Sequence, residues 1–184
     1  MFSGTNTRAL RPAALLVIAL TSGNCIISAE GELPDVEVTE RDVAIPAAPL
    51  EADGSDVAVS VVFKQKPARV GLPKDSFSEV RVLSVGVTAK SGISDLAFLK
   101  GLRVTATSAE ATAAGFAPVE IARFERNGSS GAGPTLLIPA NPPADVTSLW
   151  KSTEVVFTLA AVGQMPTTAW TADVGMRFGA TISY

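Results

Sequence analysis

The sequence predicts an all-β fold, an antiparallel β-sandwich of about seven short strands. Apolar residues occupy every second position in run after run from Val57 onward, which is typical of strands with one buried face. Turn-forming Gly, Pro, Asn and Ser residues separate these runs, and no pattern indicates a helix of three or more turns. At 184 residues, the chain has room for one domain of ordinary size.

The expected strands follow one another at short intervals. In 57–63, the four residues at odd positions are Val57, Val59, Val61 and Phe63. In 79–87, the alternation changes phase after Val82, which indicates a bulge or a strand buried on both faces. Further strands are expected at 101–107, 118–124, 135–139, 152–162 and 170–184, a turn or loop at 125–134, and helical turns at 94–100 and 145–151. About seven strands in one domain predict an immunoglobulin-like sandwich for residues 57–184.

Residues 1–24 have the composition of an export signal. Arg8 and Arg11 precede the apolar run "AALLVIAL" at 13–20, and small and polar residues follow it. The run is about 8 residues long, whereas a membrane-spanning helix needs roughly 20. We therefore expect a signal peptide that is removed from the mature protein.

The end of this segment, "LTSGNC" at 20–25, resembles a bacterial lipoprotein signal, because small residues lead directly to Cys25. The resemblance implies that Cys25 becomes the N-terminus and carries palmitate-type acyl chains. It also implies attachment to the cell envelope, at the outer membrane because Ile26 rather than Asp follows the cysteine. Asn24 stands where Gly, Ala or Ser is usual, so ordinary cleavage after Ala29 remains the alternative. That cleavage would give a secreted or periplasmic protein without cysteine.

Residues 25–56 are expected to form an acidic spacer between the signal and the sandwich. From 30 to 56 there are nine acidic residues and a single base, Arg41. Like charges and prolines favour an extended linker. The alternation of Val36 with Val38 and of Val43 with Ile45 equally indicates an edge strand within this segment.

The composition narrows the chemistry that is available. The chain has no histidine and one cysteine, so we expect no metal site and no cofactor. No basic cluster with interleaved aromatic residues indicates nucleic acid. "SLWK" at 148–151 and "KSG" at 90–92 match short motifs of serine acyl-transfer enzymes, but their order is reversed and the third motif is missing. We therefore expect no catalytic residues.

Two large aromatic residues, Trp150 and Trp170, are candidate ligand contacts, although core packing is the simpler interpretation. The expected function is that of a cell-envelope lipoprotein with a structural or binding sandwich, whose partners are the membrane and an envelope protein or glycan. The alternating tail from Val174 to Tyr184 resembles the closing strand of outer-membrane β-barrels, so a small barrel is one alternative. A soluble secreted binding protein is the other.

Overall fold

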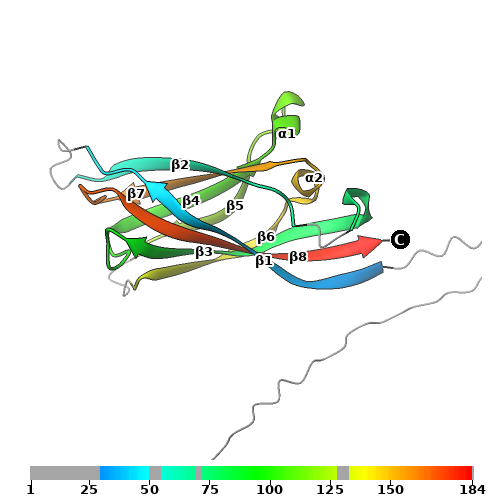
Figure 1. Ribbon diagram of the computed structural model, residues 1–184, viewed down its shortest axis with the longest axis horizontal. Coiled ribbons are helices and arrows are strands. Elements are labelled where there is room, and N and C mark those ends of the chain that lie inside the picture. The colour runs from blue at the N-terminus through cyan, green and yellow to red at the C-terminus, as the bar shows by residue number, and fades with distance from the viewer. Residues whose placement is uncertain (1–29, 50–54, 69–71, 128–132, 184) are drawn as a thin grey trace, which may run out of the picture.

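The computed structural model describes residues 30–49, 55–68, 72–127 and 133–183 (Figure 1). Within them the chain forms an antiparallel β-sandwich, which confirms the predicted fold class. The strands are β1 (Glu30–Ile45), β2 (Val57–Gln65), β3 (Phe77–Ser91), β4 (Leu99–Thr107), β5 (Val119–Glu125), β6 (Thr135–Asp145), β7 (Val155–Gly163) and β8 (Trp170–Ser183). The helical segments are the 3-10 helix η2 (Lys74–Ser76), α1 (Ala109–Ala113) and α2 (Thr147–Trp150).

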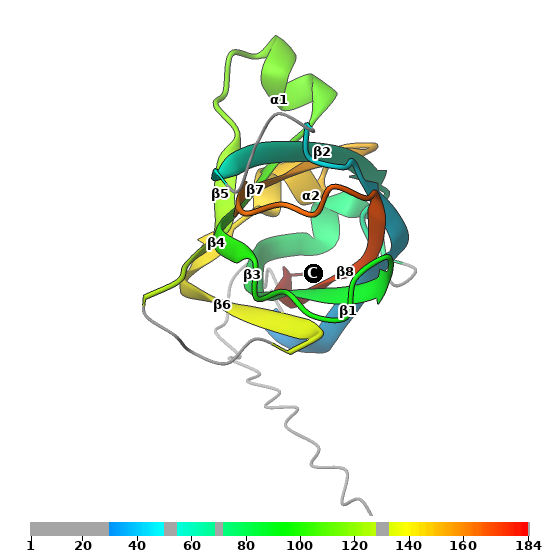
Figure 2. The same cartoon turned by 90° about the vertical axis from the view of Figure 1, so that its left-hand side faces the viewer.

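The strands form two four-stranded sheets, ordered β1-β8-β3-β6 and β2-β7-β4-β5. The first strand pairs with the last, the second with the seventh, the third with the sixth and the fourth with the fifth. This nested pairing of eight strands is the order of a jelly roll, which differs from the seven-strand immunoglobulin arrangement. Each of the two sheets has two edge strands, so the eight strands do not close into the small barrel that was the alternative fold. Figure 2 looks along the sandwich, with β2 near the top and β6 near the bottom.

The core lies between the sheets and consists of the inward residues of every strand. The interior side chains of β3 and β8 are fully or almost fully buried, as are those of β4 and β7 in the opposite layer. Phe63 of β2 stacks on Phe157 of β7, with ring centroids 5.5 Å apart. Burial of these apolar side chains stabilises the fold without any disulfide.

The predicted phase change in 79–87 is confirmed as a β-bulge. The register of β3 shifts between Val82 and Ser84 against both of its neighbours, β6 and β8. The extra residue, Leu83, is therefore turned out of the core, and its side chain lies over Gly179 of β8. The bulge lets Val82 and Val85 face the interior although their spacing is odd.

From Glu30 to Ile45 the acidic segment forms a strand of the sandwich, which is the edge strand that its alternation of apolar residues indicated. Residues 30–45 form the edge strand β1, so the extended spacer does not describe them. The strand shifts register twice, between Leu33 and Val36 and between Glu40 and Val43. These bulges change the parity of the alternation, so that apolar residues keep facing inward while most of the carboxylates face solvent at an edge. Glu40 is the exception, since it is half-buried and accepts a hydrogen bond from the side chain of Gln65 in β2.

The helical turn expected at 145–151 forms as α2. The carboxylate Oδ1 of Asp145 accepts a hydrogen bond from the backbone N–H of Thr147 at 2.9 Å, which satisfies a free donor of the first turn. The prediction of a helical turn at 94–100 is wrong, because no residue of this segment is helical. There the carboxylate of Asp95 accepts from the backbone N–H of Ala97 at 2.8 Å, and a tight turn leads directly into β4.

The helix α1 was not anticipated by the sequence, although Ser108 begins it in the manner of an N-cap. The Ser108 hydroxyl accepts a hydrogen bond from the backbone N–H of Ala111 at 3.0 Å. Over the residues that the structure describes, no helix has the length and apolar character needed to cross a membrane. Cys25 and the signal segment lie outside those residues, as do 128–132 of the predicted loop.

Candidate functional site

The two tryptophans that were candidate ligand contacts are buried at opposite ends of the sandwich. Trp150, in α2, is 4% exposed, and Trp170, at the start of β8, is 2% exposed. Trp170 packs edge-to-face against Phe98, with ring centroids 5.5 Å apart. Neither indole N–H has a hydrogen-bond partner within the described residues. The two side chains share no surface, so they offer no exposed aromatic platform.

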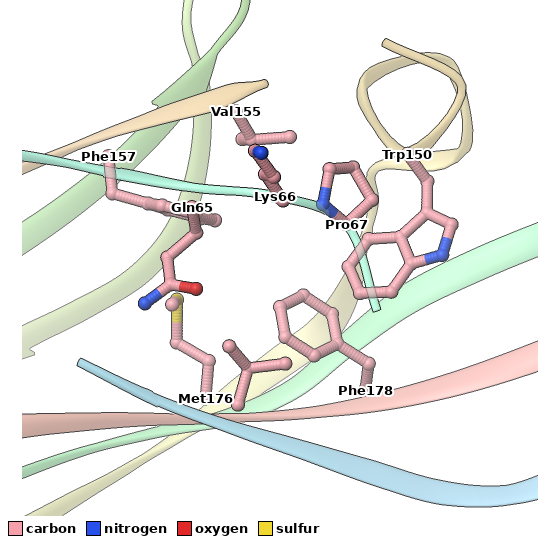
Figure 3. A pocket seen from close by; sticks show the side chains of 9 residues that line it. Gln65, Lys66, Pro67, Trp150, Val155, Phe157, Met176 and Phe178 are labelled. Atoms are coloured by element: carbon pink, nitrogen blue, oxygen red, sulfur yellow. The ribbon is translucent and has the colours of Figure 1, made fainter. Parts of the chain in front are cut away.

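A small cavity lies beside Trp150, between the end of β2 and the inner faces of β7 and β8 (Figure 3). The six-membered ring of the indole points toward Pro67 and Phe178, and Met176 and Phe157 line the opposite side. The cavity measures about 10 Å³, which is room for about one water molecule. Its walls are mostly apolar, which is typical of a small gap in core packing. Its volume is too small for a ligand.

A larger open groove of about 480 Å³ adjoins this cavity. Three lysines from separate parts of the chain line it, Lys66, Lys74 and Lys151, together with Pro67 and Thr153. All three lysines are exposed, so their ammonium groups stay hydrated and charged. The groove therefore gathers three of the six lysines of the chain at one place on the surface.

The lysines of this groove differ from the other lysines of the chain in their lack of a described ion pair. Three lysines elsewhere form ion pairs, Lys64 with Glu154 at 2.8 Å, Lys90 with Asp173 at 3.4 Å and Lys100 with Asp56 at 2.9 Å. Within the described residues, the three lysines of the groove form no ion pair or hydrogen bond that would neutralise them. An anion in the groove would therefore gain attraction that no carboxylate already supplies.

Three local structures place these lysines at one end of the sandwich. Lys66 follows the last residue of β2, and Pro67 ends that strand because it lacks a backbone N–H. Lys74 opens η2, directly after Pro73. Lys151 ends α2, whose position is fixed by the packing of Trp150. The three residues are 8 and 77 positions apart in the sequence, so no local motif could have revealed the groove.

One carboxylate reaches the edge of the groove. Oε1 of Glu110, in α1, accepts a hydrogen bond from the backbone N–H of Thr153 at 3.4 Å. This bond and one from its own backbone N–H hold the pKa of Glu110 below its ordinary value. Glu110 is therefore ionised at neutral pH, and it limits the positive potential on the α1 side of the groove.

A second groove, of about 340 Å³, lies between the edge strands β5 and β6. Its charged residues already neutralise one another. Glu120 lies 2.5 Å from Arg103 and 2.8 Å from Arg123, and the hydrogen bond from Arg123, with the charges of both arginines, lowers the pKa of Glu120 to about 2. This groove therefore offers a ligand less unpaired charge than the lysine-lined groove.

The two acyl-transfer motifs do not assemble into a site. Ser148 is exposed on α2, whereas Lys90 and Ser91 lie at the end of β3, at the opposite end of the sandwich. Ser91 hydrogen-bonds to Thr171 at 2.7 Å, as expected for a strand end, and Lys90 pairs with Asp173. Among the residues that the structure describes, no three carboxylate or thiol groups gather closely enough to hold a metal ion.

No protein-family model and no curated protein matches the chain. Among solved structures, it is similar to a chain from the three-dimensional structure of Cocksfoot mottle virus, at 12% identity and a TM-score of 0.36. The alignment covers 96% of this chain and 95% of the viral chain. At this TM-score the likeness is too loose to transfer fold or function, so the function rests on the groove.

Proposed function

We propose that this chain is a cell-envelope lipoprotein, acylated at Cys25, whose sandwich is a non-catalytic module that binds anionic groups in the lysine-lined groove. One observation carries the binding role: the three lysines without a described ion pair all line one groove. Phosphate and carboxylate groups are the ligands that ammonium groups bind most strongly.

Acylation rests on the sequence from Leu20 to Cys25 and on its resemblance to lipoprotein signals. Cleavage before Cys25 leaves β1 whole, because the strand begins at Glu30. Cleavage after Ala29 leaves it whole as well, so the fold is compatible with the secreted or periplasmic alternative. The outer membrane is the proposed location for the acylated form.

Labelling with a palmitate analogue tests the anchor. We expect the wild-type protein to incorporate the label, to partition into detergent and to have the mass of an acylated chain that begins at Cys25. The Cys25→Ala variant should not incorporate label. A wild-type mass that corresponds to an unmodified chain beginning at Glu30 would instead establish the secreted alternative.

Titration with inorganic pyrophosphate at low salt tests the groove, with the backbone amide signal of Thr153 as the NMR reporter. The variant Lys66→Gln/Lys74→Gln/Lys151→Gln should bind at least about tenfold more weakly than wild type, because it loses the charged donors. The matched control is Lys64→Gln/Lys90→Gln/Lys100→Gln, which changes the net charge equally but removes ion-paired lysines. Equal weakening by both variants would show that net charge, and not the groove, governs binding.

A further inference from the structure

We infer that the lysine-lined end of the sandwich faces the bilayer that holds the anchor, and that lipid phosphates are the anions bound in the groove. The inference rests on the proposed acylation of Cys25 and adds the partner and the orientation of the domain. Three observations support it: the position of the first residue of β1, the distribution of unpaired lysines and the position of one exposed aromatic residue.

The first observation concerns reach. Four residues separate Cys25 from Glu30, so the chain between them spans at most about 18 Å. The strand β1 spans about 44 Å from Glu30 to Ile45, because it runs beside the whole of the 14-residue strand β8. An acyl group on Cys25 therefore holds the Glu30 end of the sandwich close to the bilayer, and the Ile45 end lies farther away than that linker can reach.

The second observation is that the lysine-lined groove lies at this same end. Glu30 pairs with Ser183, and Ile182 pairs with Phe77, the first residue of β3 after η2. The end of β2 at Gln65 lies opposite the start of β7 at Val155, next to α2. Figure 1 shows the start of β1, the end of β8 and α2 toward its right-hand side. The anchor therefore brings Lys66, Lys74 and Lys151 toward the lipid headgroups.

Two of the three ion-paired lysines lie at the other end, whereas Lys64 lies at the Glu30 end and is paired with Glu154. Lys100 lies next to Leu99, which pairs with Gly163 at the far end of β7, and Lys90 lies at the end of β3. Both are neutralised by Asp56 and Asp173. Among the residues that the structure describes, lysines without an ion pair lie only at the membrane-proximal end, and each lysine near an anionic bilayer raises the partition coefficient about fivefold.

The third observation is Phe116, which is 70% exposed on the connection between α1 and β5. That connection lies at the Glu30 end, because Thr107 pairs with Val156 near the start of β7 and Ala106 pairs with Val119. Aromatic side chains are favoured at the headgroup level of a membrane. Exposed carboxylates lie at this end too, so the attraction is confined to the groove and does not extend over the whole face; they are Glu30, Glu32, Asp75, Glu110 and Asp145.

Depth-dependent quenching of the acylated, full-length mature protein in vesicles tests the orientation. Cys25 is the sole cysteine and is blocked by acylation, so a single new cysteine carries the dye. Ala117→Cys places the dye beside Phe116, and Ala97→Cys is the matched control, an exposed alanine on the β3–β4 connection at the other end. In phosphatidylglycerol vesicles, spin-labelled lipid should quench the dye at 117 several-fold more than the dye at 97.

The lysines are tested in the Ala117→Cys background. Neutral phosphatidylcholine vesicles, or the Lys66→Gln/Lys74→Gln/Lys151→Gln substitutions, should reduce quenching at 117 toward that at 97. The Lys90→Gln/Lys100→Gln control, which removes the two ion-paired lysines at the other end, should leave it unchanged. Equal quenching at both sites, or stronger quenching at 97, would overturn the orientation while leaving the acylation and pyrophosphate results intact. A protein that is never acylated would instead refute the proposed function.

Discussion

Trp150 packs against Phe178 at the lysine-lined end of the sandwich, with ring centroids 4.7 Å apart and ring planes tilted by 52°. The contact joins α2, a helix of one turn, to β8, a central strand of the sheet β1-β8-β3-β6. A helix of four residues is not stable by itself. The position of α2, and with it that of Lys151, therefore depends on this aromatic pair.

Replacing Trp150 should be among the most destabilising single substitutions. We expect Trp150→Ala to lower the free energy of unfolding by about 3–5 kcal/mol, since it leaves a cavity where the indole packed. Trp150→Phe should cost less, because it keeps a ring in contact and removes a buried N–H that has no partner. Urea unfolding followed by circular dichroism measures both. Phe116→Ala, at an exposed position, should stay within about 0.5 kcal/mol of wild type.

Gly163 cannot accept a side chain. It has φ of 156°, and a Cβ there would lie 2.0 Å from the carbonyl oxygen of Phe98. We expect Gly163→Ala to cost about 3 kcal/mol or more, because the backbone of the β3–β4 connection must move. Gly86→Ala is the control, since the nearest atoms to its Cβ would lie at 3.9 Å. Similar melting temperatures for the two variants would contradict the close approach at Gly163.

Asp145 should contribute to stability in a pH-dependent way. The hydrogen bonds from the side chain and the backbone of Thr147 hold the pKa of Asp145 below its ordinary value of 3.8. The contribution is therefore complete above about pH 4 and is lost as the pH falls through the folded-state pKa. Asp145→Ala should be about 1 kcal/mol less stable at pH 7, and the difference should shrink toward pH 2. A difference of the same size at both pH values in urea titrations would refute this role.

The edge strand β1 should be essential to the fold. A chain that begins at Glu30 retains every described strand, so we expect it to unfold cooperatively. A chain that begins at Val57 lacks Val43 and Ile45, which are 6% and 1% exposed, and uncovers the edge of β8. We expect that shorter chain to aggregate or to lack a thermal transition. A cooperative transition in the shorter chain would restore the spacer interpretation.

Much of the sandwich could be read from local pattern. The seven strands from β2 to β8 were all predicted, because one-sided burial imposes a two-residue alternation, although β3 and β6 continue four and six residues beyond the predicted ends. The bulge at Leu83 was also indicated by the sequence, because the alternation changes phase after Val82. The strand β1 was harder to predict from the sequence, because its two bulges interrupt the alternation and its many carboxylates are equally typical of a linker.

The candidate site was not predicted. The tryptophans attracted attention because they are rare and large, yet both fill the core. The three lysines gave no signal, since nothing in their local sequence separates Lys66 from Lys64. What distinguishes them is the absence or presence of a carboxylate from a distant part of the chain, as in the pair of Lys64 with Glu154.

The sequence by itself determined the class of fold, the candidate acylation site at Cys25 and the narrow range of available chemistry, because alternation and composition are local properties of the chain. The tertiary structure decided the strand order, the membership of β1 in the sandwich and the gathering of Lys66, Lys74 and Lys151 in one groove. These features depend on which distant strands pair and which side chains they bring together, and pairing between distant segments is not encoded in any short stretch of sequence.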